Sequence, residues 1–558
     1  MLRISARALV LMLLSLLLWS WNAGASDEKV PASGDADTSV WIGRLLATDP
    51  DAELQAFYRM REQRPAWKDG QAVATFAAAI HALDGDGLLP EDYRPDALVQ
   101  AHDLAYADAS PEKRARFDVE ASRTLLTVLR HLQCGKVNPL DVDPDWELPR
   151  VTSRLDLATI SRAIDAQQFD SVFAAARPTH PLYDRLRAGL ERYRQIARQG
   201  GWPMLSAQAM PLHPGDRHQE IPLLRQRLAL VGDLDVSAAT GCADAEHPAA
   251  PPDPYCYDEV LAAAVRHFQR RHLLTADGVI AARTRAALNI PVGARIDQIR
   301  VNLERARWLL HDLPPSFVLV DIAGYQLSYF LPDGKIWRTR IVDGRPTRQT
   351  PILRSAVTYL TFNPTWTVPP TILREDMLPK VRKDPAYLTR ENIAVLDADG
   401  TRLDPVTIDW SQPGGLTLRQ EAGPHNSLGR VVMRFPNRHQ VYLHDTPAQP
   451  LFSLDQRAIS SGCIRVEHAL ELARLLLDDD NRWNRDAIAE IVATGRTGDV
   501  HLSRAVPLIV SYWTVHADAE GALSFRPDIY QRDSALLAAL NRPLPSPAWI
   551  RFATAAPE

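Results

Sequence analysis

The spacing of apolar residues predicts that the first part of the chain is helical. Leu54, Phe57 and Tyr58 follow one another at intervals of three and one, and similar groups recur from residue 40 to about 205. Such spacing places apolar side chains on one face of a helix. We therefore expect a helical scaffold domain over residues 40–205. The preceding residues 26–39 are small, polar and charged, and are predicted to be a disordered linker.

A second, shorter group of helical patterns covers residues 215–291. Leu224 and Leu228 open it, and Leu261, Val265 and Phe268 continue it at helical spacing. Glycine and aspartate between these runs indicate tight turns. The pattern predicts a small module of about three helices.

From residue 316 the pattern changes to short β-rich runs, separated by turn signals such as Pro-Asp-Gly-Lys at 332–335. This alternation predicts a mostly-β domain over 300–515, followed by a C-terminal segment at 516–558. The strands are expected at 317–321, 325–330, 339–342, 358–362, 429–435 and 439–444, and a helix at 466–477.

Residues 369–412 interrupt the strand pattern with prolines, charges and a helical run at 372–381. A long insertion in a β domain is more often functional than idle. A lid over a site is the favoured interpretation, and a plain surface loop is the alternative.

The first 25 residues have the pattern of a cleavable secretory signal. Arg3 and Arg7 precede an apolar run from Ala8 to Trp21, and Ala23-Gly24-Ala25 is a small-residue cleavage site. This pattern predicts a periplasmic protein, with an uncleaved inner-membrane anchor as the alternative.

Net charge and cysteine content limit the kinds of partner and site that the protein is expected to have. The 558 residues carry a net charge of −5, which speaks against a nucleic-acid partner. Cys242 and Cys256 bracket a proline-rich stretch, and an oxidising compartment would permit a disulfide between them. The spacing of the four cysteines does not resemble a metal site.

The strongest chemical signal combines His444 with Cys463. His444 alternates with apolar Val441 and Leu443, so it faces away from the core if those residues face toward it. Cys463 follows in the turn Ser460-Ser461-Gly462-Cys463, directly before the predicted helix. A helix N-terminus and an imidazole would both lower the pKa of the thiol. The amides around Gly462 and Cys463 are candidates for an oxyanion hole, and a carbonyl near Asp445 is a candidate partner for the imidazole.

The run "VYLHDTPAQPLFSLDQRAISSGCIRVEHALELARLLL" resembles the catalytic signature of the L,D-transpeptidases, with their YkuD-type domain. His444, Ser460, Gly462, Cys463 and Arg465 occupy the places of that signature, whereas Ser461 stands where many members have histidine. The Ser-Ser form, together with "RVNLERARWLL", "FNPTWTVPPTI" and "HNSLGRVVMRFPN", is similar to the large YcbB-like subgroup. The run "AVRHFQRRHLLTADGVIAARTRAAL" resembles a three-helix peptidoglycan-binding module, and a helical spacer without a ligand remains the alternative.

This resemblance implies a multidomain α and β protein with a helical scaffold, a peptidoglycan-binding-like module, and a mostly-β catalytic domain with a lid. It implies that Cys463 attacks a tetrapeptide stem, releases D-alanine and forms a thioester. A diaminopimelate amine of a second stem then takes the acyl group to give a three-to-three cross-link. His444 is implied as the base, no metal or organic cofactor is required, and carbapenem-type inhibitors and other wall synthases are expected partners. Further candidates are Ser460 and Ser461 in the turn, Arg465 for a substrate carboxylate, and Tyr442, Trp366 and Asn363 as cleft walls.

Three other functions stay open from the sequence. A carboxypeptidase or a D-amino-acid exchange enzyme would share the same acyl-enzyme. A non-catalytic wall-binding protein would need Cys463 or His444 to be misplaced. A cysteine peptidase acting on proteins fits less well, because the module at 215–291 indicates the cell wall.

Overall fold

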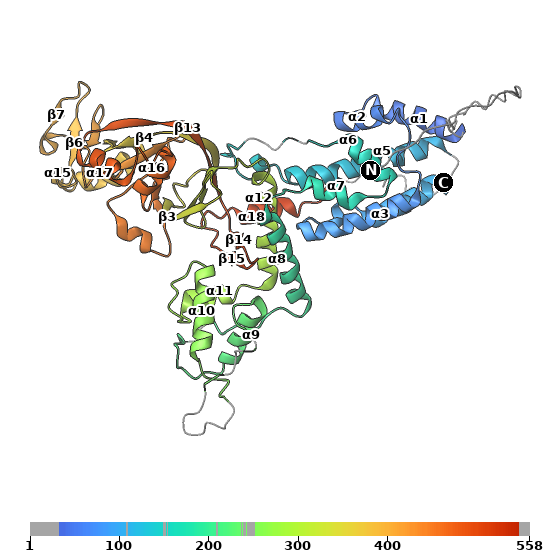
Figure 1. Cartoon of the computed structure of the whole chain (residues 1–558), viewed down its shortest axis with the longest axis horizontal. Helices are drawn as coiled ribbons and strands as arrows, with labels where there is room; N and C mark the ends of the chain where they lie inside the picture. Colours follow the sequence, from blue (N-terminus) through green and yellow to red (C-terminus); the bar gives the residue numbers. More distant parts are fainter. Residues whose placement is uncertain are drawn as a thin grey trace, which may run out of the picture.

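The computed structural model describes residues 33–545, except 108–109, 149–151, 153, 208–209, 236, 238–240 and 243–251. The predicted signal at 1–25 lies outside these residues. Figure 1 shows helices at one end, a β-rich domain at the other, and a smaller group of helices beside the junction. None of the described helices is long and apolar enough to cross a membrane.

The N-terminal region is helical, as the apolar spacing predicts. Its helices pack around a core that includes Trp67, Phe76 and Phe169. Side chains such as Asp51 cap helix N-termini by accepting hydrogen bonds from backbone N–H groups. The prediction of a disordered linker up to residue 39 is wrong from residue 33 onward, because the first helix already begins there. The helices are α1 Ser33–Leu46, α2 Ala52–Met60, α3 Gly70–His81, α4 Pro95–Ala107, α5 Pro111–Cys134, α6 Leu157–Asp165, α7 Phe169–Ala176 and α8 Pro181–Arg198.

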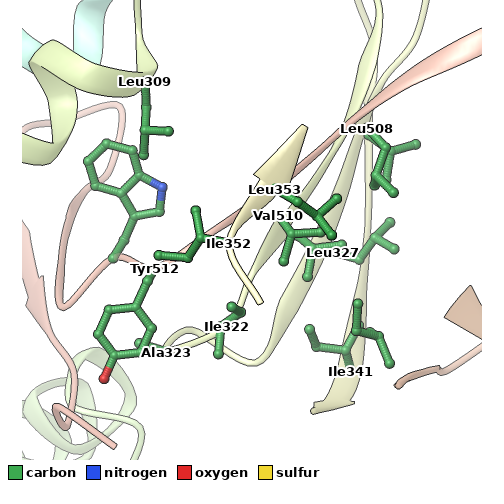
Figure 2. Packing of buried hydrophobic residues seen from close by; sticks show 14 of the residues in the cluster. Leu309, Ile322, Ala323, Leu327, Ile341, Ile352, Leu353, Leu508, Val510 and Tyr512 are labelled. Carbon is green, nitrogen blue, oxygen red and sulfur yellow. The ribbon is translucent and has the colours of Figure 1, made fainter. Parts of the chain in front are cut away.

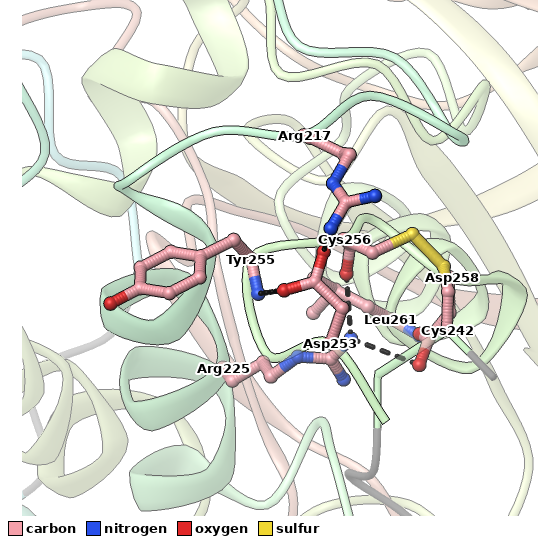
Figure 3. The surroundings of a disulfide bond; sticks show 8 residues. All are labelled: Arg217, Arg225, Cys242, Asp253, Tyr255, Cys256, Asp258 and Leu261. Carbon is pink, nitrogen blue, oxygen red and sulfur yellow. Dashed lines mark hydrogen bonds and ion pairs between the residues drawn. A yellow bond between two sulfur atoms is a disulfide. The ribbon is translucent and has the colours of Figure 1, made fainter. Parts of the chain in front are cut away.

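Three helices, α9 (Ile221–Val231), α10 (Glu259–Arg271) and α11 (Ala282–Leu288), form the group beside the junction. They share a separate apolar core. Cys242 and Cys256 form a disulfide bond, the pair suggested by the sequence (Figure 3). It lies next to Asp253, whose carboxylate pairs with Arg217.

Helix α12 (Val292–Leu309) leads into a nine-stranded sheet with the order β11-β3-β12-β10-β9-β4-β13-β1-β2. Strand β3 also pairs with β2, so the sheet closes on itself. Leu327, Leu353 and Val510 are among the residues that fill its core (Figure 2). The strands are β1 Phe317–Asp321, β2 Gln326–Phe330, β3 Ile336–Gly344, β4 Leu353–Phe362, β9 Val431–Arg434, β10 Leu443–His444, β11 Ala458–Ser460, β12 Ile464–Val466 and β13 Gly498–Ser511.

The insertion at 369–412 builds a structure of its own. It contributes to a separate four-stranded sheet with the order β5-β8-β6-β7. Its core is distinct from that of the large sheet and includes Met377, Val381 and Leu418. The elements are β5 Trp366–Thr367, α13 Pro370–Ile372, η5 Leu373–Met377, α14 Leu378–Val381, α15 Ala386–Arg390, β6 Ile393–Leu396, β7 Arg402–Leu403 and β8 Thr417–Gln420.

The C-terminal part returns to the junction between the regions. Strands β14 (Val515–Ala517) and β15 (Leu523–Phe525) form a hairpin, and α18 (Asp533–Leu540) packs against α12. Helix α16 (Ala469–Leu477) packs against β9 and β13 of the large sheet, and α17 (Arg485–Ala493) packs against α16.

Candidate active site

His444 lies on strand β10, and Cys463 directly precedes the neighbouring parallel strand β12. Strand β10 pairs with β12 so that His444 stands opposite Arg465 and Leu443 opposite Ile464. Cys463 directly precedes β12, and the Ile464 amide donates to the Tyr442 carbonyl.

This register separates a core face from a chemical face. Val441, Leu443, Ile464 and Val466 are buried in the core of the sheet. Because side chains alternate along each strand and paired residues share a face, Tyr442, His444, Cys463 and Arg465 lie together on the other face. The two predicted reactive residues are therefore diagonal neighbours on one surface of the sheet.

The imidazole of His444 is oriented by its own backbone. Its Nδ1 lies 2.6 Å from the Asp445 carbonyl oxygen, the acceptor suggested by the sequence. A carbonyl can only accept, so Nδ1 carries the proton and Nε2 is left with a free lone pair. Burial, followed by the nearby Arg465 guanidinium, lowers the pKa of His444 to about 3. The imidazole is therefore neutral at physiological pH, and its Nε2 is unprotonated.

The Asp445 carboxylate takes a different role. It accepts the Arg430 amide at 2.8 Å and lies against Gly429, where any side chain would collide with it. The carboxylate thus holds the start of β9 to the end of β10 instead of orienting the imidazole.

The pKa of the Cys463 thiol shifts in the direction opposite to the one predicted. Burial raises its pKa, and hydrogen bonds from Tyr442 with the charges of Arg434 and Arg465 oppose this effect only in part. The predicted helix at 466–477 begins only at Ala469, because β12 follows the cysteine and His468 adopts a left-handed conformation. The prediction that a helix N-terminus stabilises the thiolate is therefore wrong.

Two arginines surround the pair. Arg465 is partly buried, and its Nε finds no acceptor within the described part of the chain. The Arg434 guanidinium lies 4.8 Å from the centre of the Tyr442 ring. Sequence reasoning did not single out Arg434, although the antiparallel pairing of β9 with β10 brings it opposite Tyr442. Together the two cations make this face suitable for an anionic group.

The turn before Cys463 is held by an internal hydrogen-bond network. Ser460 Oγ donates to the Cys463 carbonyl at 2.6 Å and accepts the Gly462 amide at 3.1 Å. Gly462 has a φ of 110°, a conformation that side chains disfavour. Since Ser460 occupies the Gly462 amide, the Cys463 amide is the better candidate for an oxyanion donor.

The insertion contacts this turn through Arg348. The Arg348 guanidinium donates to Ser461 Oγ at 2.9 Å and pairs with Glu375 at 2.6 Å and with Asp376. Arg345 pairs with the same Asp376 at 3.0 Å. Two arginines beside the turn therefore hold η5 of the insertion close to Cys463.

Trp366 and Asn363, two of the predicted cleft-wall residues, contact other parts of the fold. Trp366 lies in β5 and packs against the core of the insertion. Asn363 is buried, and its amide donates to the carbonyls of Ile491 and Arg496 at 2.9 and 3.3 Å. Asn363 thus fixes the end of β4 to the α17 region. No group of three or more potential metal ligands occurs among the described residues.

Two parts of the chain match models of known protein families. Residues 315–500 match the model of the L,D-transpeptidase catalytic domain. The chain contains an L,D-transpeptidase catalytic domain. Residues 52–190 match a scaffold domain. His444, Cys463 and the insertion all lie within the catalytic-domain match.

A curated protein of Haemophilus influenzae, described as a "Putative L,D-transpeptidase", is 33% identical over 251 residues. The alignment covers 44% of this chain and 50% of that protein, so the match spans about half the length of the relative.

Two solved L,D-transpeptidase structures are also similar. The structure from Mycobacterium smegmatis has 15% sequence identity and a TM-score of 0.16. The match covers 35% of this chain and 58% of the Mycobacterium chain. The structure from Xylanimonas cellulosilytica has 14% sequence identity and a TM-score of 0.17. The match covers 54% of this chain and 98% of the Xylanimonas chain. These scores are too low to support a comparison of the folds.

Proposed function

We propose that this protein is a periplasmic L,D-transpeptidase that forms three-to-three cross-links between peptidoglycan stems. The observation that carries the proposal is the pairing of β10, which holds His444, with β12, which Cys463 directly precedes, within the matched catalytic domain. The donor is a tetrapeptide stem ending in D-alanine, and the acceptor is the side-chain amine of diaminopimelate on a second stem.

The first half-reaction starts from a neutral pair. Because the pKa of Cys463 is raised and that of His444 is about 3, the resting site holds a thiol and an imidazole. Proton transfer to Nε2 therefore accompanies attack of sulfur on the donor carbonyl. The carbon–nitrogen bond to D-alanine breaks, the imidazolium returns the proton to the leaving amine, and a thioester remains.

The second half-reaction reverses these roles. His444 removes a proton from the acceptor amine as nitrogen attacks the thioester carbonyl. The carbon–sulfur bond breaks and the thiol is restored. In both steps the Cys463 amide would stabilise the oxyanion.

The arginines of this face supply recognition of the donor. Arg465 has an unsatisfied Nε beside Cys463, as far as the described residues show. A guanidinium binds a carboxylate through two parallel hydrogen bonds. We assign Arg465 to a carboxylate of the donor stem, with Arg434 adding positive potential.

The insertion at 369–412 acts as a lid in this proposal. Its carboxylates Glu375 and Asp376 pair with Arg348, which also contacts Ser461 next to the nucleophile. A lid held there would exclude water and favour the amine over hydrolysis of the thioester.

Export and wall binding complete the proposal. The disulfide between Cys242 and Cys256 supports an oxidising compartment, in line with the signal pattern at 1–25. The α9–α11 group would bring the enzyme to the wall, and other wall synthases remain expected partners.

The products formed from disaccharide-tetrapeptide test the reaction. The proposal predicts a cross-linked dimer and free D-alanine with the natural enzyme, and neither with Cys463→Ala or His444→Ala. Tripeptide without dimer would indicate a carboxypeptidase, and exchanged D-amino acid without dimer would indicate an exchange enzyme.

A further inference from the structure

The turn that carries Cys463 is supported from behind by two other segments of the chain. One is the loop 344–350, which joins β3 to β4. The other is the C-terminal segment around Tyr530, which lies beyond the matched catalytic domain. We propose that Thr350 and Tyr530 are positioning residues, which set the direction of the Cys463 amide during acyl transfer. This inference rests on the proposed function, because it assumes that Cys463 is the acylated nucleophile.

Thr350 makes the direct contact with the turn. Its Oγ1 donates to the Gly462 carbonyl oxygen at 2.9 Å and accepts the Gly344 amide at 2.9 Å. The residue is completely buried, so water cannot replace either bond. One hydroxyl thus connects the end of β3 to the residue before the nucleophile.

Because the peptide unit is planar, the contact that fixes the Gly462 carbonyl also fixes the direction of the Cys463 N–H, the candidate oxyanion donor. The Gly462 carbonyl and the Cys463 amide belong to one planar trans peptide unit, in which C=O and N–H point in opposite directions. Because Thr350 binds the Gly462 carbonyl, the Cys463 N–H of the same peptide unit points away from Thr350, and we assign this N–H to the oxyanion. The neighbouring Gly462 amide, already bonded to Ser460 Oγ, is not available for that task.

Tyr530 fixes the loop that carries Thr350. Its hydroxyl donates to the Gly344 carbonyl at 2.6 Å and accepts the Thr350 amide at 3.1 Å. Burial raises the pKa of Tyr530, so the phenol keeps its proton and its donor role. The Tyr530 hydroxyl therefore bridges Gly344 and Thr350, the two ends of the loop.

The loop needs a glycine at its start. A Cβ on Gly344 would lie 2.3 Å from the Arg348 carbonyl oxygen and 2.7 Å from the Thr350 nitrogen. Only glycine lets the loop fold back this closely. The Arg345 amide also donates to the Ser460 carbonyl at 3.0 Å, which adds a second link to the turn.

Tyr530 is itself held by the C-terminal segment. Its amide donates to the Tyr512 hydroxyl at 3.0 Å, and that hydroxyl donates to Asp528 at 2.7 Å. The rings of Tyr512 and Tyr530 stack with centres 5.5 Å apart. The network thus extends from β13 and the C-terminal segment to the Gly462–Cys463 peptide.

Two reactions of the same thiol separate positioning from general stability. Acylation by a carbapenem passes through an oxyanion and needs the Cys463 amide, whereas alkylation by iodoacetamide has no oxyanion. We expect Thr350→Val to slow acylation by about 10- to 100-fold, while alkylation changes by less than about threefold. Thr350→Ser keeps the hydroxyl and should restore acylation to near the natural rate.

Tyr530→Phe removes one oxygen and should slow acylation by about tenfold, again without a matching loss of alkylation. Tyr183→Phe is the matched control, since it removes a buried hydroxyl that bonds to Asp86 and Arg307, away from the turn. It should leave both rates unchanged even if the melting temperature falls.

Each result decides a separate question. Normal acylation of Thr350→Val, or equal losses of acylation and alkylation in Thr350→Val and Tyr530→Phe, would overturn the positioning role. Failure of the natural enzyme to be acylated at Cys463, despite normal alkylation, would overturn the proposed function and this inference with it.

Discussion

The Nδ1 atom of His444 lies 2.6 Å from the carbonyl oxygen of Asp445. This contact fixes one tautomer, with the proton on Nδ1 and the lone pair on Nε2. The imidazole is thus prepared as a base without help from a carboxylate, because the Asp445 side chain serves the Arg430 amide instead. The acid–base chemistry of the site depends on this backbone contact and on the two arginines around it.

The first prediction concerns the ionisation of Cys463. Burial raises the pKa of the thiol, and burial with Arg465 lowers the pKa of His444, so the two groups do not form an ion pair at rest. Only the thiolate is alkylated. The alkylation rate, measured with iodoacetamide, should therefore continue to rise with pH above about 8.5, the usual pKa of cysteine.

His444→Ala is the control for this profile, and its curve should keep the same shape because the neutral imidazole does not stabilise the thiolate. A plateau reached below pH 7 in the natural enzyme would instead indicate a thiolate–imidazolium pair.

The second prediction concerns donor binding by Arg465. Replacing this arginine with glutamine removes a charge-assisted contact that contributes about 1.5–3 kcal/mol. KM for a tetrapeptide donor should rise by about 10- to 100-fold, with a smaller change in kcat. Arg474→Gln, which removes the pairing of this α16 residue with Glu471, is the control and should not change KM. An unchanged KM in Arg465→Gln would exclude this arginine from donor recognition.

The third prediction concerns the insertion. Asp376→Asn weakens its pairing with Arg345 and Arg348 and should loosen the proposed lid. Water would then compete better for the thioester, so the ratio of tripeptide to dimer should rise several-fold. Asp384→Asn, which removes an exposed pair with Arg390 inside the same insertion, should leave the ratio unchanged. If Asp376→Asn also leaves it unchanged, the lid role is wrong.

The fourth prediction concerns stability and the buried Asp343. Neither carboxylate oxygen of this residue has a hydrogen-bond partner within the described regions, and burial raises its pKa well above the usual value. The folded state therefore binds this proton more tightly than the unfolded state does. Its contribution to stability is complete below about pH 4 and is lost as pH rises toward the folded pKa.

Asp343→Asn removes the ionisation, so its melting temperature should exceed that of the natural protein by a few degrees at pH 8 and by less at pH 4. The exposed variant Asp333→Asn should show no such difference. A gain that grows toward low pH would contradict the assignment.

The sequence predicted the parts of the site that depend on local patterns. The alternation around His444 predicted its face of the strand, and the apolar runs predicted strands β1 to β4, β9 and β10 and the helical N-terminal region. The helix after Cys463 was misplaced, because Val466 fits a helical spacing but belongs to β12, and the left-handed His468 separates the two elements. The spacing of apolar residues cannot separate a strand of three residues from the helix that follows it.

The remaining site residues depend on contacts between distant segments. Thr350 reaches Gly462, Tyr530 reaches Gly344, and Arg348 reaches Ser461, each across more than 100 residues of chain. No periodicity or motif carries that information. These residues became visible only once the closed sheet had brought three segments to one turn.

The most direct test of the central claim is the intact mass of the protein after brief incubation with disaccharide-tetrapeptide. The account predicts a species heavier by the mass of the donor minus that of alanine, located on Cys463 and absent from Cys463→Ala. Turnover without any such species in the natural enzyme, or the same species in Cys463→Ala, would contradict it.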